Sequence, residues 1–168
     1  MDGTTSQAAQ TVALKTARVR DAQTLLDIHR AAALEAFAHV FPPERYPFPS
    51  EAIGARWNHV LESRELEVTV ALRRGRAVGF VAFAPGRLDS LYVLPDEWGS
   101  GAADLLYRSA LRRLESWPGR PFRLWVLAEN PRARRFYERR GWKADGRTRR
   151  APFPPYPELV GYSLDAEL

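Results

Sequence analysis

Residues 91–103 read Leu91-Tyr92-Val93-Leu94-Pro95-Asp96-Glu97-Trp98-Gly99-Ser100-Gly101-Ala102-Ala103, and this stretch decides the fold. An apolar strand ends, the chain turns through two glycines, and a helix begins at once. Glycine lets the backbone bend sharply and approach a ligand closely. The first amides of a helix lack internal partners and carry partial positive charge, so a phosphate or diphosphate fits there. Taken alone, the segment is also compatible with a tight turn that binds nothing.

Two common nucleotide-binding motifs do not fit this turn. A P-loop needs a lysine directly after its glycines, and none is present here. The dinucleotide fingerprint follows the first strand of a parallel unit, whereas this turn comes in the middle of the chain. Walker-type nucleotide hydrolysis and a Rossmann-type dinucleotide site are therefore excluded.

A second segment continues the pattern about thirty residues further on. It reads Leu124-Trp125-Val126-Leu127-Ala128-Glu129-Asn130-Pro131-Arg132-Ala133-Arg134-Arg135-Phe136-Tyr137-Glu138-Arg139-Arg140-Gly141-Trp142. A strand ends at Asn130, which suits a helix cap, and proline suits the first helical position. Ala133, Phe136 and Tyr137 share one side of this helix by their three- and four-residue spacing. Tyr137 is thereby predicted to reach the space between the two strands.

The remaining elements follow from periodicity and turn residues. We expect strands at 12–19, 66–72, 77–83, 88–94, 122–127, 142–148 and 159–164, and helices at 22–40, 50–64, 102–117 and 131–141, the first of them capped by Asp21. Hairpins followed by strand–helix–strand units predict an α/β (α+β) fold with a mixed sheet covered by helices on both faces. Neither an internal repeat nor a linker between domains is evident.

Size and composition restrict the class of protein. The 168 residues suit a single domain, which we place at 11–168 after a small, polar tail at 1–10. The chain has no cysteine, which excludes disulfides, zinc–thiolate sites and a cysteine nucleophile, and we expect no metal. No stretch is apolar for long enough to span a membrane, and the first residues do not form a signal peptide. We therefore expect a cytoplasmic protein without a membrane partner.

The net charge of +5 comes almost entirely from arginine. One interpretation is a nucleic-acid-binding domain, and the other is solvated helix faces plus one site for an anionic cofactor. The arginines are spread along the chain with acidic residues among them, which favours the second interpretation and predicts no nucleic-acid partner.

Together the two glycine- and asparagine-centred segments resemble the GNAT superfamily of acetyl-CoA-dependent N-acetyltransferases. The family's Gln/Arg-x-x-Gly-x-Gly/Ala motif is matched at Gly101 and Ala103, with Trp98 in the place of Gln or Arg. Its Asn-x-x-Ala-x-x-Phe/Leu-Tyr-x-x-x-Gly-Phe motif is matched at Asn130, Ala133, Phe136, Tyr137 and Gly141, with Trp142 for the phenylalanine. The resemblance implies a mostly antiparallel sheet of about six or seven strands, about four helices, and a fourth and fifth strand that splay apart.

The resemblance also implies an acetyl-CoA site in the gap between those strands, and coenzyme A as a product. It assigns cofactor binding to Leu91, Val93, Trp98, Gly99, Ser100, Gly101, Ala102, Ala103, Asn130, Ala133 and Arg134. Backbone amides near Leu91 and Val93 would bind the pantetheine arm and polarise the thioester carbonyl. Tyr137 would protonate the leaving thiolate, and the alternative for it is a packed aromatic residue whose hydroxyl finds a partner.

The group that removes the proton from the amine stays open. Some members of the family carry a glutamate early in the fifth strand, where this sequence has Trp125. Asp89 and Glu129 are the candidate catalytic carboxylates, although each can equally be a solvated surface residue. A water chain to solvent needs no dedicated base.

The loops 41–49 and 151–157 combine proline with aromatic residues, and we expect them to wall the acceptor pocket. The candidate acceptor residues are Tyr46, Phe48, Phe153 and Tyr156, with Glu35 at the end of the first helix. The alternative is that these loops cover the edge of the core or a dimer contact. An apolar wall suits a small amine or a peptide N-terminus.

Three functions are compatible with these features. The first is N-acetyl transfer from acetyl-CoA to a primary amine by direct attack in a ternary complex, which is the function we expect. The second is a non-catalytic sensor that binds acyl-CoA, and the third is a basic nucleic-acid-binding domain. The sequence is compatible with a homodimer and does not name the acceptor.

Overall fold

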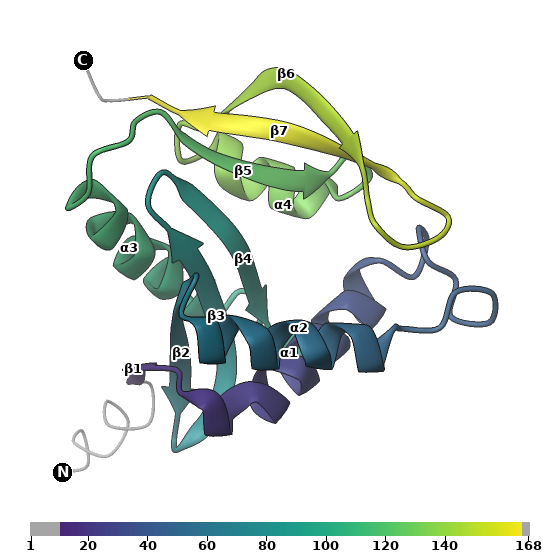
Figure 1. Cartoon of the computed structure of the whole chain (residues 1–168), viewed down its shortest axis with the longest axis horizontal. Coiled ribbons are helices and arrows are strands. Elements are labelled where there is room, and N and C mark those ends of the chain that lie inside the picture. The colour runs from purple at the N-terminus through teal and green to yellow at the C-terminus, as the bar shows by residue number, and fades with distance from the viewer. Residues whose placement is uncertain (1–10, 166–168) are drawn as a thin grey trace, which may run out of the picture.

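The computed structural model describes residues 11–165, which form one mixed sheet with helices on both faces (Figure 1). The strands are β1 (Val12–Thr16), β2 (Glu67–Arg73), β3 (Arg76–Ala84), β4 (Arg87–Val93), β5 (Phe122–Leu127), β6 (Lys143–Arg150) and β7 (Glu158–Leu164). The α-helices are α1 (Ala22–Ala36), α2 (Ser50–Ser63), α3 (Ala102–Glu115) and α4 (Pro131–Glu138), with short 3₁₀ turns η1 (Val19–Asp21) and η2 (Pro95–Glu97). The tail expected at 1–10 lies outside the described residues.

The sheet has the strand order β1-β2-β3-β4-β5-β7-β6. Every neighbouring pair is antiparallel except β4 and β5, which are parallel. The mixed sheet expected from the element order and the mostly antiparallel pairing implied by the resemblance are thereby confirmed. Since the parallel pair lies in the middle of the order, it joins a half formed by β1–β4 to a half formed by β5, β7 and β6. In Figure 1 the four-stranded half lies below the three-stranded half.

Two apolar clusters hold the helices to the two faces of the sheet. On one face α1 and α2 pack on β2 and β3, with Leu25, Trp57, Val60 and Phe80 among the buried side chains. On the other face α3 and α4 pack on β3, β4 and β5, with Leu106 among the buried side chains. The apolar residues of β3 supply both clusters, because successive side chains of a strand point to opposite faces, whereas β5 supplies only the α3–α4 cluster.

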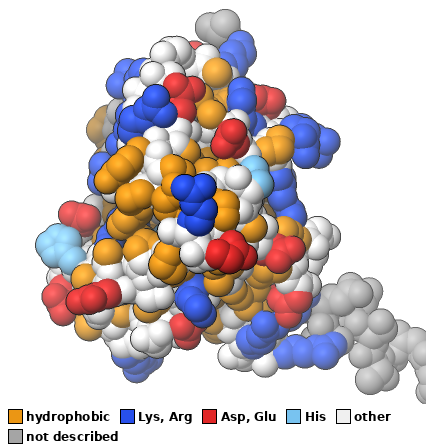
Figure 2. All heavy atoms as spheres, turned by 90° about the vertical axis from the view of Figure 1, so that its right-hand side faces the viewer, with side chains coloured by type: hydrophobic (Ala, Val, Ile, Leu, Met, Phe, Trp, Pro, Cys, Tyr) orange, Lys and Arg blue, Asp and Glu red, His pale blue; other side chains and the backbone are white. Residues whose placement is uncertain are grey.

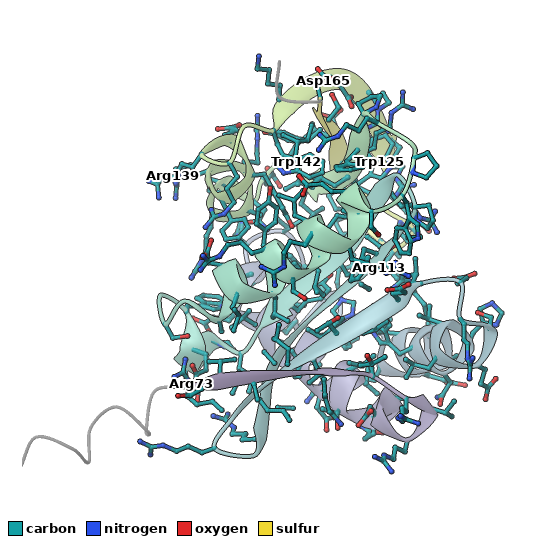
Figure 3. All side chains as sticks on the ribbon, turned by 90° about the vertical axis from the view of Figure 1, so that its left-hand side faces the viewer. Arg73, Arg113, Trp125, Arg139, Trp142 and Asp165 are labelled. Carbon is teal, nitrogen blue, oxygen red and sulfur yellow. The ribbon has the colours of Figure 1, made fainter. Side chains whose placement is uncertain are left out.

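Polar contacts between α3 and the α4 region also join the two halves of the sheet. The Trp142 indole N–H donates to the Tyr107 hydroxyl at 3.0 Å, and both side chains are buried. The Arg140 guanidinium donates to Asp104 at 3.0 Å. Figure 3 shows Trp142 in the upper half of the molecule. The halves are therefore fixed to each other on the α3 side.

The structure differs from the expected elements at the N-terminal end. The first strand stops at Thr16, and Asp21 does not cap α1 with its side chain. Its carboxylate instead accepts from Lys15 Nζ and from the Arg18 backbone N–H, both at 2.8 Å, and so organises the turn before the helix. Helix α1 also ends one turn early, because residues after Ala36 form a hydrogen-bonded turn from Phe37 to Phe41.

No helix among residues 11–165 is both long and apolar enough to cross a bilayer.

Candidate acetyl-transfer site

The central feature is the separation of β4 from β5. These strands are paired at a single register position, Arg87 with Arg123, next to a hydrogen bond from the Arg123 N–H to the Gly86 carbonyl. Beyond that point they diverge (Figure 1) and border a cleft of about 690 Å³. Residues 88–93 of β4 and 124–127 of β5 line its two sides. The cleft therefore lies between the two strands of this splayed parallel pair.

Most residues expected at the site line this cleft. They are Asp89, Leu91, Val93, Trp98, Gly99, Gly101, Ala103, Asn130, Ala133 and Tyr137. Outside the lining are Ser100, Ala102, Arg134, Glu129, Glu35, Tyr46, Phe48, Phe153 and Tyr156. The structure thus gathers most of the cofactor motif and the tyrosine in one place and leaves all five expected acceptor residues outside it.

The edge of β4 that faces the cleft carries unpaired backbone groups. The Leu94 N–H donates to the Val78 carbonyl on β3 at 2.8 Å. Since backbone groups alternate in direction along a strand, the N–H groups of Leu91 and Val93 point away from β3, toward β5. The Val93 carbonyl accepts from the Trp98 indole N–H at 2.9 Å, which agrees with that direction. Two amide donors therefore face the cleft.

The glycine turn presents further amides at the start of α3. Gly99 and Gly101 have φ values of 81° and 90°, in the region that favours glycine. The Leu105 N–H donates to the Gly101 carbonyl, and the Ser100 hydroxyl lies 3.4 Å from the Ala102 N–H. Within residues 11–165, the N–H groups of Ala103 and Asp104 donate to no protein acceptor. The helix start can therefore bind an anion such as a diphosphate.

Arginine side chains from α4 and from the residue that follows it add positive charge to this end of the cleft. Arg132, Arg135 and Arg139 line it, and none of them forms an ion pair with a carboxylate of the described chain. The Arg132 guanidinium lies 3.9 Å from the centroid of the Trp98 ring. Arg139, which follows the last residue of α4, projects outward at the rim (Figure 3). Arg132 thus places a cation beside the tryptophan that stands where the family motif has Gln or Arg.

Sequence reasoning selected Arg134 and missed these three arginines. The Arg134 guanidinium instead donates to the Tyr162 hydroxyl at 2.9 Å and to the Ala128 carbonyl at 3.1 Å. Residues 132, 135 and 139 recur at i, i+3 and i+7, which is the spacing of one helix face, whereas 134 lies off that face. This spacing in the sequence is enough to identify the three arginines as one face of the helix.

Tyr137 lies in the wall of the cleft, 7% exposed. It packs edge-on against Phe136, Tyr107 and Trp142. Its hydroxyl has no hydrogen-bond partner within residues 11–165, and burial raises the pKa of the Tyr137 phenol strongly, with smaller contributions from Tyr107 and Tyr92. The phenol therefore keeps its proton and can donate it only to a group in the cleft.

Asn130 caps α4 in the way the sequence predicts. Its side-chain oxygen accepts from the Ala133 N–H at 3.1 Å, and Pro131 follows at the first helical position. Because the oxygen is used in the cap, the Asn130 amide NH₂ is the part of the side chain that remains to contact a ligand.

Asp89 owes its direction to a β-bulge. On β3, Ala82 pairs with Ser90 and Phe83 pairs with Leu88, so Asp89 is the extra residue of β4. One carboxylate oxygen, Oδ2, accepts from Arg56 Nη2 at 2.7 Å and from the Ser90 hydroxyl at 2.6 Å. Among residues 11–165 the other oxygen, Oδ1, has no donor. Asp89 therefore offers one free carboxylate oxygen to the cleft.

Glu129 and Glu35, unlike Asp89, do not lie in the cleft. Both are exposed. The Glu129 backbone carbonyl accepts from His39 Nε2 at 2.7 Å, a contact that ties the loop after α1 to the loop before α4. Trp125, which stands where some family members have a glutamate, does line the cleft, with the guanidinium groups of Arg147 and Arg149 at 4.7 and 4.4 Å from its ring.

Both proline-rich loops lie on the right-hand side of Figure 1, and Figure 2 shows that on this side hydrophobic side chains gather around a basic one. Phe48 and Phe153 are partly buried against the α1–α2 cluster, and Phe48 packs edge-on against His29. Tyr46 is half-buried and Tyr156 is 51% exposed. Phe48 and Phe153 thus cover the edge of the core, which was the alternative interpretation of these loops.

Comparisons with known proteins agree with this geometry. The family described as acetyltransferase (GNAT) matches residues 25–142. Uncharacterized N-acetyltransferases of Mycobacterium tuberculosis and Mycobacterium bovis are 30% identical over 127 residues, which cover 69% of this chain and 81% of theirs.

Solved structures of low sequence identity share the fold. A GCN5-related N-acetyltransferase from Rhodopseudomonas palustris has a TM-score of 0.74 at 22% identity, covering 93% of this chain and 96% of its own. The PaiA N-acetyltransferase from Thermoplasma acidophilum, solved in complex with coenzyme A, has a TM-score of 0.68 at 15% identity, covering 92% and 99%. On the family match over most of its length, the chain belongs to the acetyltransferase (GNAT) family.

Proposed function

We propose that this protein transfers an acetyl group from acetyl-CoA to a primary amine of a small molecule or peptide, by direct attack while both substrates are bound. The observation that carries the proposal is the cleft between β4 and β5, bordered by free amides on one side and the Tyr137 hydroxyl on the other. The coenzyme complex of the Thermoplasma relative supports the choice of donor.

The residues present fit acetyl-CoA. The N–H groups of Ala103 and Asp104 at the start of α3 and the Arg132 guanidinium would bind the diphosphate. The N–H groups of Leu91 and Val93 would bind the pantetheine arm and the thioester carbonyl, where a fixed dipole stabilises negative charge as the amine attacks. When bound, the thioester supplies an activated acetyl group.

The reaction needs two proton movements. The ammonium first loses a proton to water at the cleft, while Asp89 holds the amine through its free oxygen. The nitrogen then forms its bond to the acetyl carbon, and the carbon–sulfur bond breaks. Tyr137 gives its proton to the departing sulfur and recovers one from the new amide nitrogen through solvent, so the net products are the amide, the free thiol and one proton.

A thiol-release assay with acetyl-CoA and a panel of amines tests the proposal, alongside calorimetry of acetyl-CoA binding. We expect saturable binding and amine-dependent release of free thiol. Binding without thiol release for any amine would indicate an acyl-CoA sensor instead. Absence of acetyl-CoA binding together with salt-dependent DNA binding would indicate the nucleic-acid-binding function.

A further inference from the structure

The sheet face next to the cleft carries a row of side chains that no part of the proposed acetyl transfer uses. Leu127 of β5 pairs with Leu159 of β7, and Leu159 pairs with Arg149 of β6. Directly paired residues of neighbouring strands point to the same face, so these three side chains form one row. Leu127 and Leu159 both line the cleft. Arg149 therefore lies at the edge of the cleft, on the same face of the sheet as Leu127 and Leu159.

Trp125 fixes the guanidinium of Arg149 at this edge. The Arg149 guanidinium carbon lies 4.4 Å from the centroid of the Trp125 ring, a cation–π contact, and the ring itself lines the cleft. Figure 3 shows Trp125 in the upper half of the molecule. Stacking on a large ring reduces the freedom of a long side chain, so the guanidinium is held in place before any ligand arrives.

The neighbouring Arg147 contacts the same ring but is neutralised locally. It forms a short ion pair with Asp145 at 2.6 Å. Both residues lie over Gly161 of β7, where an added Cβ would come within 2.7 Å of Asp145 and 3.0 Å of Arg147. Arg149 has no such partner among the carboxylates of residues 11–165. One of the two arginines on Trp125 is thus available to an anion.

Asp89 of β4 lies on the same side of the sheet as Arg149 of β6. Both lie on the α1–α2 side of the sheet, because Asp89 pairs with Arg56 of α2 and Trp125 points away from the α3–α4 cluster that buries Leu124 and Val126. Partial burial lowers the pKa of Arg149, and the charge of Asp89 acts against that effect. The negative charge of Asp89 therefore acts on Arg149, while Oδ1 of Asp89 has no donor among residues 11–165.

We propose that the acceptor is a small amine that also carries a carboxylate, with its ammonium on Asp89 and its carboxylate on the Arg149 guanidinium above Trp125. This inference rests on the proposed function, since it names the substrate class of the same cleft. The charges support it: Arg56, Arg149 and Asp89 leave this end of the cleft with one positive charge more than negative, which suits a zwitterion and disfavours a diamine. A guanidinium fork also matches a carboxylate in geometry.

Initial rates with matched acceptors test the proposal. Leucine, leucinamide and isoamylamine differ only in the carboxylate, and phosphoethanolamine offers a phosphate instead. We expect kcat/KM to be at least about tenfold higher for leucine than for the other three, because only leucine can form the charge-assisted hydrogen bond between its carboxylate and Arg149. Equal use of isoamylamine, or preference for phosphoethanolamine, would overturn the assignment of a carboxylate.

Arg149→Gln is the decisive variant, and Arg150→Gln on the same strand is its matched control, because within residues 11–165 the Arg150 side chain hydrogen-bonds only to the Tyr156 carbonyl of the loop. We expect Arg149→Gln to raise KM for leucine by about 10- to 100-fold, with KM for isoamylamine and the Kd for acetyl-CoA unchanged. Arg149→Glu should reverse the preference toward a diamine. An equal change in KM for both amines would mean that Arg149 acts only through packing.

Calorimetry separates a failure of this inference from a failure of the proposed function. Leucine is titrated into the protein saturated with coenzyme A, where no turnover takes place. Binding of leucine that is lost in Arg149→Gln, together with no thiol release from acetyl-CoA, would keep the carboxylate site and reject the acetyl transfer. Thiol release with isoamylamine and no measurable binding of leucine would do the opposite.

Discussion

At the scale of single residues, a substitution of Tyr137 can change catalysis without changing the stability of the fold. Its ring is packed on three aromatic neighbours, whereas its hydroxyl bonds to nothing within residues 11–165. Tyr137→Phe keeps the packing and removes the proton donor. We expect kcat to fall by about 100-fold or more while the Kd for acetyl-CoA and the free energy of unfolding stay the same. Steady-state kinetics, calorimetry and urea unfolding measure these quantities.

Tyr162→Phe is the control for Tyr137. Its hydroxyl donates to Glu138 and accepts from Arg134, outside the lining of the cleft. Its loss should cost roughly 1 kcal/mol of stability and leave kcat unchanged. If Tyr137→Phe kept full kcat at saturating substrate, the assignment of Tyr137 as the acid would be wrong.

Arg132 is the residue that we expect to matter most for the diphosphate. It reaches the cleft from α4 and stacks on Trp98, and burial lowers the pKa of its guanidinium, which is consistent with a partly desolvated charge. Arg132→Gln should raise the Kd for acetyl-CoA by roughly tenfold, since a charge-assisted hydrogen bond is lost. Arg112→Gln, an exposed change on α3, should leave Kd unchanged. A larger loss of affinity in Arg134→Gln than in Arg132→Gln would restore Arg134 as the cofactor ligand.

At the scale of elements, the start of α3 can be tested with two glycines that both have a positive φ. Gly101 has a φ of 90° and Gly75, in the β2–β3 turn, has a φ of 76°, and an added Cβ meets no atom within 4 Å at either place. Alanine at either position should therefore destabilise the fold by a similar amount, about 1–2 kcal/mol. Only Gly101→Ala should weaken acetyl-CoA binding, because only Gly101 lines the cleft. Equal affinities for the two variants in calorimetry would contradict the α3 start as the diphosphate site.

The junction of α1, α2 and β4 predicts a pH dependence of stability. His29 of α1 accepts from the Trp57 indole N–H of α2 at 3.1 Å and stacks on Tyr92 of β4, with ring centroids 4.1 Å apart. Burial lowers the pKa of His29 from 6.5 to about 3, and Arg56 adds to the effect. Between these values the unfolded chain binds a proton that the folded protein does not. Stability from His29 is thus complete above pH 6.5 and is lost as the pH falls toward 3.

The His29→Gln variant measures this contribution, because glutamine can still accept from Trp57 but does not titrate. Urea unfolding between pH 7 and 4.5 should show a slope that is smaller in the variant by up to about 1.4 kcal/mol per pH unit. Carboxylates with lowered pKa values, such as Asp21 and Asp145, add a slope of the same sign in both proteins and cancel in the difference. His59→Gln, at an exposed position, should leave the slope as it is. Parallel slopes for wild type and His29→Gln would show that His29 is not held neutral.

At the scale of the whole molecule, the sequence predicted what depends on local order and missed what depends on contacts across the sheet. The turn at Gly99–Gly101 and the cap at Asn130 are set by neighbours in the chain, and both were found. The environment of Asp89 depends on Arg56, 33 residues away, and the row from Leu127 to Arg149 depends on strand order. Neither of these contacts produces a periodic pattern within one segment of the chain. Asp89 could therefore be named as a candidate from the sequence, whereas Arg149 could not be found.

The splayed sheet makes a last prediction about how the two halves respond to the donor. Acetyl-CoA in the cleft would contact β4 and the α3 start from one half and Asn130 and Arg132 from the other, where now a single register position joins β4 to β5. Ligand at 100 times its Kd should stabilise the fold by about 2.7 kcal/mol and raise Tm by roughly 5–10 °C. Amide hydrogen exchange should slow in β4, β5 and α4 together, and change least in β1 and β2, which lie away from the cleft. Protection confined to the α3 start would mean that the ligand binds one half alone, and the gap between the strands would then have no part in holding it.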